Sequence, residues 1–96
     1  MSILPMDIQR VFGLNMRRLR LATGLSQEAA ADLTKLGRAH VSSIERGQGN
    51  VTLTTVDAVA KVLRCEWAEL FDVQAARSFA ASSATDAPRI KSKRRS

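Results

Sequence analysis

The sequence predicts an all-α fold in which five short helices form one compact domain and a basic tail follows. Apolar residues recur at helical three- and four-residue spacing up to about residue 71. Ser, Thr or Asp stands before several of these stretches, where a helix N-cap is expected. The one strand-like run, VTLTTV, is better explained as a helix start with a Thr cap. We expect the domain to cover residues 7–72 and the tail to cover residues 73–96.

The first two helices have start and stop signals. Asp7 is the expected N-cap of the first helix, and Gly24 stands just past its end. Ser26 is the expected N-cap of the second helix, with Glu28 in its first turn at the positive end of the helix dipole. The expected apolar stripe of the first helix is Ile8, Phe12, Met16 and Leu19.

The remaining three helices complete the domain. The third is expected from about Arg38 to Arg46, with Gly47 ending it. Thr52 is the expected cap of the fourth, and a short fifth helix follows at about Trp67–Phe71. The buried side of the fourth helix is expected to be Leu53, Val56, Val59, Ala60 and Leu63.

The composition changes after Asp72. VQAARSFAA can extend a helix, because alanine is the strongest helix former. SSATDAPRIKSKRRS combines Ser, Pro and charge with one large apolar residue, Ile90, and is expected to be disordered. Residues 72–96 hold six Lys and Arg against two Asp, so most of the formal net charge of +6 lies there. A basic balance favours nucleic acid or an acidic membrane surface as a partner, although the tail charge can also serve solubility alone.

Composition and motifs argue against several classes of protein. Cys65 is the single cysteine, which rules out an internal disulfide and fits a reducing cytosol, and a buried, inert thiol is expected there. No apolar run approaches the ~20 residues of a membrane span, and MSILPMD lacks a secretory signal, so a cytoplasmic protein is expected. His40 and Cys65 alone do not make a metal site, and no nucleophile–base set is visible. We therefore expect no enzyme, no cofactor and no small-molecule site.

The stretch LSQEAAADLTKLGRAHVSSIERG is the most informative part of the chain. Gln27 opens one short helix, and Ala31 provides the small residue that a close helix crossing needs. Val41 and Ile44 are the two apolar anchors of the next helix, which leaves one face available to a partner. Together with MRRLRLATGLSQ, VSSIERGQGN and EWAELF, this stretch resembles the lambda-repressor-like (Cro/repressor, XRE) helix-turn-helix family from about Phe12 to Phe71.

The resemblance implies a transcriptional regulator that binds double-stranded DNA in a sequence-specific way. Such proteins place the second helix of the motif in the major groove and bind as homodimers to pseudo-palindromic operators, with half-sites about 34 Å apart. The expected base-reading residues on that helix are Arg38, Ala39, Ser42 and Ser43. Arg38 can bond guanine in a bidentate fork, Ala39 can touch a thymine methyl, and the two serines specify bases only weakly.

Phosphate contacts are expected around this face. The resemblance places Gln27 on a phosphate oxygen, and the loop residues Gln48 and Asn50 form a second contact or an ordinary turn. Further expected phosphate contacts are Lys35, His40 and Arg46. The resemblance also implies a partly buried ion pair between Arg20 and Glu45, which ties the first helix to the end of the recognition helix.

Three residues depart from the family pattern. Lys35 and Arg64 stand where the family usually has glycine, and Gly37 stands where it usually has a Ser or Thr cap. A residue other than glycine in a left-handed turn costs about 1–2 kcal/mol. These differences affect the geometry of the turns and leave the predicted fold unchanged.

A homodimer needs an apolar contact surface, which we expect near the end of the domain. The candidates are Leu70, Phe71, Val73 and Phe79, together with Trp67. For Trp67 and Leu70, burial in the core is the alternative. The alternative function is an antitoxin or a protein-interaction module that keeps the fold without specific base reading. An RNA binder is less favoured, since the few aromatic residues leave no stacking platform.

Overall fold

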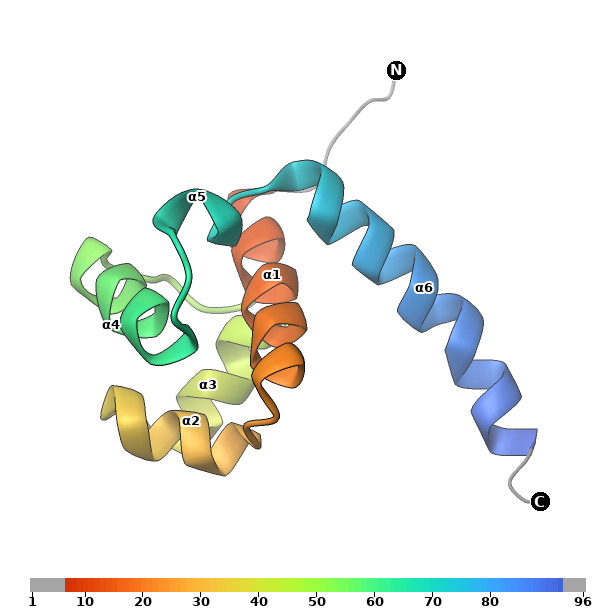
Figure 1. Ribbon diagram of the computed structural model, residues 1–96, viewed down its shortest axis with the longest axis horizontal. Coiled ribbons are helices and arrows are strands. Elements are labelled where there is room, and N and C mark those ends of the chain that lie inside the picture. Colours follow the sequence, from red (N-terminus) through yellow and green to blue (C-terminus); the bar gives the residue numbers. More distant parts are fainter. Residues whose placement is uncertain (1–6, 93–96) are drawn as a thin grey trace.

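The structure, a computed structural model, is helical throughout the part of the chain that it describes. It describes residues 7–92, with the side chains of residues 7–82. The helices are α1 (Ile8–Thr23), α2 (Gln27–Thr34), α3 (Arg38–Glu45), α4 (Leu53–Leu63), α5 (Trp67–Leu70) and α6 (Val73–Ser92). In Figure 1, α1 to α5 form the body of the molecule, and α6 starts beside α1 and extends away from it. The predicted all-α class is confirmed.

The predicted helix caps form as local hydrogen bonds. The side chains of Asp7, Ser26 and Thr52 each accept from the backbone N–H three residues further on, at 2.9–3.1 Å. These bonds satisfy N–H groups that have no partner inside the helix. Gly24 ends α1 in a left-handed conformation, with φ of 83°. The starts of α1, α2 and α4 are therefore where the sequence places them.

Two apolar clusters hold the helices together. The main core contains Phe12, Met16, Ala31, Val41, Ile44, Val56, Val59, Ala60, Leu63 and Leu70. It contains residues from all five helices α1 to α5, and Val41 and Ile44 are the buried apolar residues of α3. A smaller cluster joins α1 to α6 and contains Val11, Leu14 and Ala76, with Phe79 and Ala80 packed against it.

The inner side of α3 lies very close to the backbone of α1. A Cβ atom added to Gly13 would stand 2.2 Å from the carbonyl oxygen of Ile44. Real Cβ atoms do not approach an oxygen so closely, so only glycine permits this contact. Gly13 thus lets the backbones of the two helices meet.

Two expected positions are wrong. Ile8 and Leu53 were assigned to buried stripes, but they are 68% and 85% exposed. Each is the first residue of its helix, where the neighbouring helices no longer cover it. Trp67, for which burial was the alternative, is 61% exposed, and its indole Nε1 donates to Asp57 Oδ1 at 3.2 Å.

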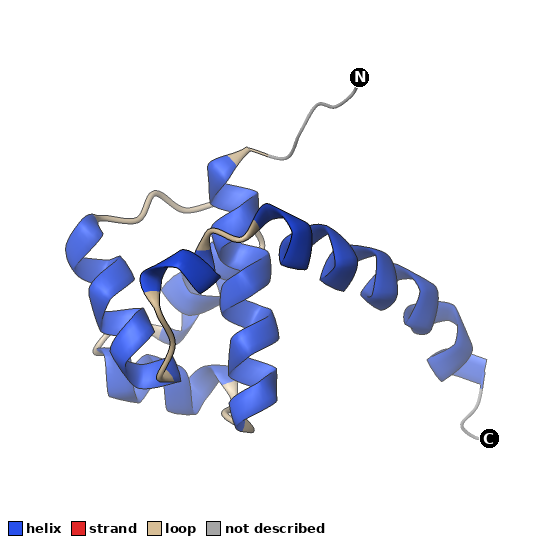
Figure 2. Ribbon diagram, turned by 45° about the horizontal axis from the view of Figure 1, so that its top comes forward, coloured by secondary structure: helices blue, strands red, loops and turns tan. Residues whose placement is uncertain are grey.

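The expectation of a disordered tail after residue 81 also needs correction. Helix α6 continues through this stretch to Ser92, so the body carries a sixth helix (Figure 2). The composition offers a physical reason, because alanines recur at residues 80, 81, 84 and 87 and favour a helix. The last four residues of the tail, 93–96, lie outside the described residues.

Asn15 is a buried polar residue that connects α1 to the start of α6. It is fully buried, and its Nδ2 donates to the carbonyl oxygens of Leu70 at 3.1 Å and Asp72 at 3.0 Å. Its Oδ1 accepts from the guanidinium of Arg18 at 3.0 and 3.1 Å. All of its polar atoms are therefore paired, as a buried amide requires. Arg18 is half-buried in this contact.

Candidate nucleic-acid interface

Helices α2 and α3 form a compact pair joined by a tight turn. Ala31 of α2 is buried in the same cluster as Val41 and Ile44 of α3, as expected for a close crossing. Lys35 ends α2 in a left-handed conformation with φ of 67°, and Gly37 is the N-cap of α3 without a side-chain bond. The turn therefore keeps the geometry that glycine usually provides, at the steric cost of a lysine.

The outward face of α3 presents its first turn to solvent. Arg38, Ala39 and His40 are exposed, and Ser42 is half-buried. A hollow of about 290 Å³ is lined by Gln27, Arg38, Ala39 and Ser42. The structure thus brings three of the four predicted base-reading residues together with the predicted phosphate contact Gln27.

The fourth predicted base-reading residue lies elsewhere. Ser43 is half-buried, and its Oγ would be 3.8 Å from a Cβ atom at Gly49. Its side chain therefore faces the loop after α3 and is not part of the hollow. With Val41 and Ile44 turned inward, Ser42 and Ser43 fall on different edges of the exposed face.

The end of α3 has its own polar contacts. The guanidinium of Arg46 donates through Nη1 to Ser42 Oγ, and through Nε to Gln48 Oε1 at 3.4 Å. All three are predicted DNA contacts, and Arg46 and Gln48 are exposed. Ser42 also lines the first-turn hollow, so its hydroxyl links that hollow to the C-terminal end of α3.

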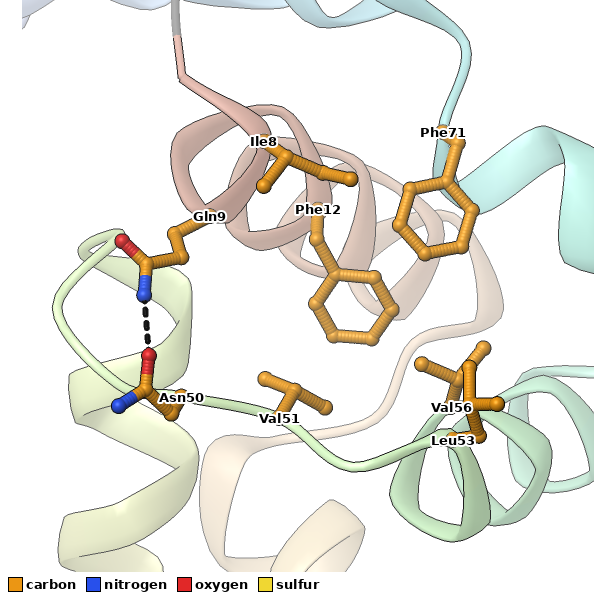
Figure 3. Close-up of a pocket in the computed structure, with 8 residues that line it drawn as sticks. All are labelled: Ile8, Gln9, Phe12, Asn50, Val51, Leu53, Val56 and Phe71. Carbon is orange, nitrogen blue, oxygen red and sulfur yellow. Dashed lines mark hydrogen bonds between the residues drawn. The ribbon is translucent and has the colours of Figure 1, made fainter.

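Asn50 is fixed by a residue that the sequence did not single out. Gln9 Nε2 at the start of α1 donates to Asn50 Oδ1 at 2.5 Å (Figure 3). This contact uses the carbonyl oxygen of Asn50 and leaves its amide N–H₂ as a donor. The two amides lie at one end of an apolar groove of about 250 Å³, lined by Ile8, Phe12, Val51, Leu53, Val56 and Phe71.

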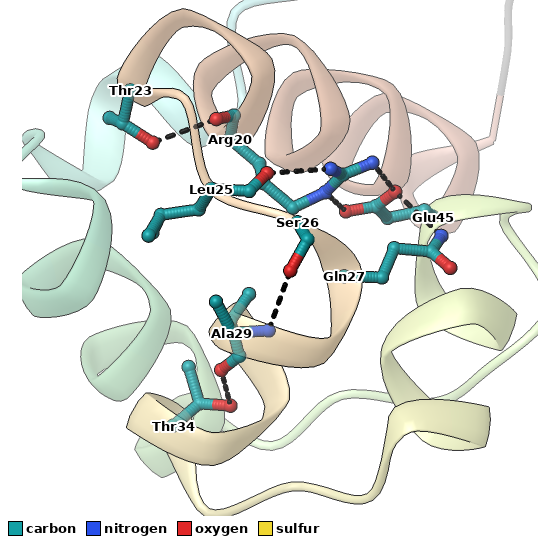
Figure 4. A network of polar contacts seen from close by, with 9 residues as sticks. Arg20, Thr23, Leu25, Ser26, Gln27, Ala29, Thr34 and Glu45 are labelled. Carbon is teal, nitrogen blue, oxygen red and sulfur yellow. Dashed lines mark hydrogen bonds and ion pairs between the residues drawn. The ribbon is translucent and has the colours of Figure 1, made fainter.

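Arg20 of α1 and Glu45 of α3 form a buried ion pair that joins the two helices. Arg20 Nε donates to Glu45 Oε2 at 2.6 Å, and its Nη2 donates to Oε1 at 2.9 Å (Figure 4). The two side chains are only 7% and 2% exposed. Arg20 Nη1 also donates to the carbonyl oxygen of Leu25 at 2.9 Å, so the pair ties α1, the following loop and α3 together.

Gln27 joins this buried network, which the sequence did not predict. Its Nε2 donates to Glu45 Oε1 at 3.1 Å, so one carboxylate oxygen accepts from both Arg20 and Gln27. Gln27 is the first residue of α2 and is half-buried. It therefore connects the ion pair to the exposed hollow.

The predicted dimer contacts are only partly available at the surface. Leu70 is 0% exposed and belongs to the main core, so its assignment to a dimer surface is wrong. Phe71 is half-buried, with its ring centroid 5.4 Å from that of Phe12, and Phe79 is half-buried against α1. Val73 is 43% exposed. The largest exposed apolar side chains of this region include Trp67, and also Leu53, which the sequence assigned to the interior.

Two titratable side chains lie near that surface. Hydrogen bonds from Lys61 and then Trp67 hold the pKa of the Asp57 carboxyl below its ordinary value. Burial, followed by the charge of Glu69, raises the pKa of the Cys65 thiol, which is half-buried where full burial was expected. Among the described residues, His, Cys, Asp and Glu form no group that could hold a metal ion. Within the same part of the chain, every helix is too short or too polar to cross a bilayer.

Comparison with known proteins gives the family. A helix-turn-helix family model matches residues 16–70. Control protein C.SmaI of Serratia marcescens is 41% identical over 58 residues, covering 60% of this chain and 69% of that protein. Control protein C.BamHI of Bacillus amyloliquefaciens is 36% identical over 67 residues, covering 69% and 83%.

Solved structures agree with these sequence matches. The restriction-modification controller protein C.AhdI from Aeromonas hydrophila superposes with a TM-score of 0.63 and 46% identity, covering 66% of this chain and 96% of that one. The hypothetical transcription factor NHTF from Neisseria superposes with a TM-score of 0.68 and 32% identity, covering 74% and 82%. The family match spans α2, the turn and α3, where the hollow and the buried ion pair lie. The chain therefore belongs to the HTH_3 helix-turn-helix family, as its resemblance to lambda-repressor-like proteins predicted.

Proposed function

We propose that this chain is a transcriptional regulator without enzymatic activity that binds double-stranded DNA in a sequence-specific way. The observation that supports this most directly is the hollow at the start of α3, where Gln27, Arg38, Ala39 and Ser42 meet on one exposed surface. An exposed helix start of this kind can enter the major groove and reach base edges. The relatives named as controller proteins and transcriptional regulators favour the same function.

Arg38 is the proposed main reader of sequence. It is exposed in the first turn of α3, and its guanidinium can bond the O6 and N7 atoms of guanine together. Ala39 beside it is small enough to let a thymine methyl group approach. Ser42 adds a weaker polar contact from the next turn.

Phosphate contacts are proposed on both sides of this reading surface. Gln27 flanks the hollow, while Lys35 and His40 are exposed near the start of α3. Arg46, Gln48 and Asn50 lie at the other end of the helix. Contacts of this kind hold the protein in register on the duplex without reading sequence.

We also propose that the protein binds its operator as a homodimer through the surface that carries Leu53 and Trp67. Leu53 lies one helical turn before Asp57, which accepts from the Trp67 indole, so the two apolar side chains share one side of α4 and α5. Leu53 also lines the apolar groove with Ile8 and Phe71, which makes the exposed apolar area continuous. Such patches on a small protein commonly mark an interface.

DNA binding is tested by selecting bound sites from a random duplex pool and then measuring the affinity of Arg38→Ala for the selected site. We expect a symmetric motif, and a loss of about 1–3 kcal/mol of discrimination at one base position in each half-site. Arg77→Ala is the matched control, because Arg77 is an exposed arginine on α6. A folded Arg38→Ala protein with unchanged affinity and preference would contradict the proposal.

The dimer is tested by sedimentation equilibrium of the wild type and of Leu53→Glu. We expect a dimer that the charged residue converts to monomers, with melting temperature nearly unchanged because Leu53 is 85% exposed. Leu21→Glu, the same substitution at an exposed leucine of α1, is the control for a change of charge alone. A monomeric wild type, with or without DNA, would contradict the proposed dimer.

A protein-interaction module would give a different salt response. A DNA binder should lose affinity log-linearly with salt, with a slope of about 0.9 per neutralised phosphate. Absence of any DNA binding at low salt would favour the interaction module instead.

A further inference from the structure

One amide nitrogen connects the buried ion pair to the exposed reading surface. Gln27 Nε2 stands 3.1 Å from Glu45 Oε1, and the same oxygen accepts from Arg20 Nη2 at 2.9 Å. Figure 4 shows the nitrogen of the Gln27 amide turned toward the carboxylate and its oxygen turned away. Gln27 also lines the hollow with Arg38 and Ala39. The Gln27 side chain therefore bonds the buried Glu45 carboxylate and also borders the surface where we expect DNA to bind.

We propose that Glu45 is a positioning residue for DNA binding, which it serves by fixing the amide of Gln27. The inference rests on the proposed function and extends it to a buried residue that does not touch DNA. One N–H of Gln27 is held by Glu45, so the second N–H is directed outward as a donor to a phosphate oxygen. The ion pair thus has two effects: it stabilises the fold and it prepares a contact.

A carboxylate is well suited to orient an amide. An ionised carboxylate only accepts hydrogen bonds, so it selects the amide orientation in which nitrogen points inward. A neutral glutamine at residue 45 could donate or accept, and both orientations of Gln27 would then be available. Arg20 holds the carboxylate in place through two bonds of its own.

The expected size of the effect is moderate. A freely rotating glutamine must lose side-chain freedom when it binds DNA, and a net hydrogen bond is also modest. We expect loss of the Gln27 contact to weaken DNA binding by about 3- to 10-fold. Because the amide is neutral, the dependence of affinity on salt should keep its slope.

The test is a double-mutant cycle on DNA affinity with Gln27→Ala and Glu45→Gln. Both are made in an Arg64→Gly background, which should be more stable because Arg64 has φ of 57°. Each single variant should bind the selected operator about 3- to 10-fold more weakly than the background protein. The double variant should bind no more weakly than Gln27→Ala alone, because Glu45 acts through Gln27. Gln74→Ala, at an exposed glutamine of α6, is the control and should bind normally.

Additive losses of affinity would overturn the inference, since Glu45 would then act through the fold. No loss in either single variant would also overturn it. Neither result would contradict the proposed function, because the wild type would still bind its selected operator.

A second measurement needs no change at Glu45. In the wild-type protein, ¹⁵N NMR should show one of the two side-chain N–H protons of Gln27 protected from exchange before DNA is added. Equal and rapid exchange of both protons would overturn the inference.

Discussion

Helix α1 contacts α3 and α6 on different sides and in different ways. Toward α3, Gly13 lets the backbones meet, and the buried Arg20–Glu45 pair adds charge-assisted bonds. Toward α6, apolar side chains form a small cluster around Ala76, and the Asn15 amide holds the backbone just before the helix. The first contact has a single geometry, while the second can adjust by repacking. We therefore expect α3 to be held more rigidly than α6.

The sharpest test of this difference is Gly13→Ala. The new Cβ would stand 2.2 Å from the Ile44 carbonyl oxygen, so α1 and α3 must separate. We expect a loss of at least about 3 kcal/mol in the free energy of unfolding, measured by urea denaturation, together with loss of DNA binding. Gly37→Ala is the matched control, since a Cβ there meets nothing within 4 Å. A Gly13→Ala protein as stable as the control would show that the close contact is not required.

The α1–α6 contact should tolerate more. Phe79 is half-buried, so Phe79→Ala is expected to lower the free energy of unfolding by about 1–3 kcal/mol. This is less than the same substitution costs at a fully buried position. DNA affinity of the folded variant should be unchanged, because α3 does not pack on this cluster. Ser78→Ala, at an exposed neighbour, is the control and should stay within about 0.5 kcal/mol. A fall in DNA affinity would mean that α6 also positions α3.

Two turns contain a residue other than glycine in the left-handed conformation, and we expect the backbone to be strained there. Lys35 and Arg64 both have positive φ, so Lys35→Gly and Arg64→Gly should each raise unfolding free energy by about 1 kcal/mol in thermal or urea melts. Lys35→Gly should also reduce the salt slope of DNA binding by about 0.9, as one phosphate contact is removed. Gly24→Ala is the opposite substitution, at a glycine with φ of 83° and open space around it. It should lower the free energy of unfolding. Equal stabilities would show that these backbones relax without cost.

The smallest effect concerns Cys65, beside the contact between α1 and α5. Burial raises the pKa of its thiol, so reaction with a thiol reagent should increase only at a pH above that of an ordinary cysteine. The thiol is harder to ionise in the folded state, so its contribution to stability is present at neutral pH and is lost as pH rises through the raised pKa. Reaction in urea supplies the unfolded control. A reaction midpoint at or below that control would contradict the expected shift.

Local signals in the sequence predicted much of the fold. Asp7, Ser26 and Thr52 act on N–H groups only three residues away, so the starts of their helices could be located. The family match likewise confirms the helix-turn-helix pair that Ala31, Val41 and Ile44 indicated. Spacing along one helix could not place Leu53, because its burial depends on whether another helix reaches the first turn of α4.

Long-range polar contacts were harder to predict. Asn15 bonds groups 55 and 57 residues away, and Gln9 bonds Asn50 41 residues away. Gln27 was assigned to phosphate from the resemblance, but its bond to Glu45 depends on how two helices meet. In the candidate site, sequence indicated the exposed residues of α3, and packing decided which of them share a hollow. Ser43 was separated from the others for that reason.

The anchoring of Leu70 and Asp72 by one buried amide has a practical consequence. Helix α6 begins at Val73, directly after the second anchored carbonyl, and its 20 residues span about 30 Å. Asn15 thus helps to set the direction in which α6 leaves the body of the molecule. A fluorophore or fusion partner attached near residue 92 would report the angle between α6 and the body, and Asn15→Ala should make that angle more variable.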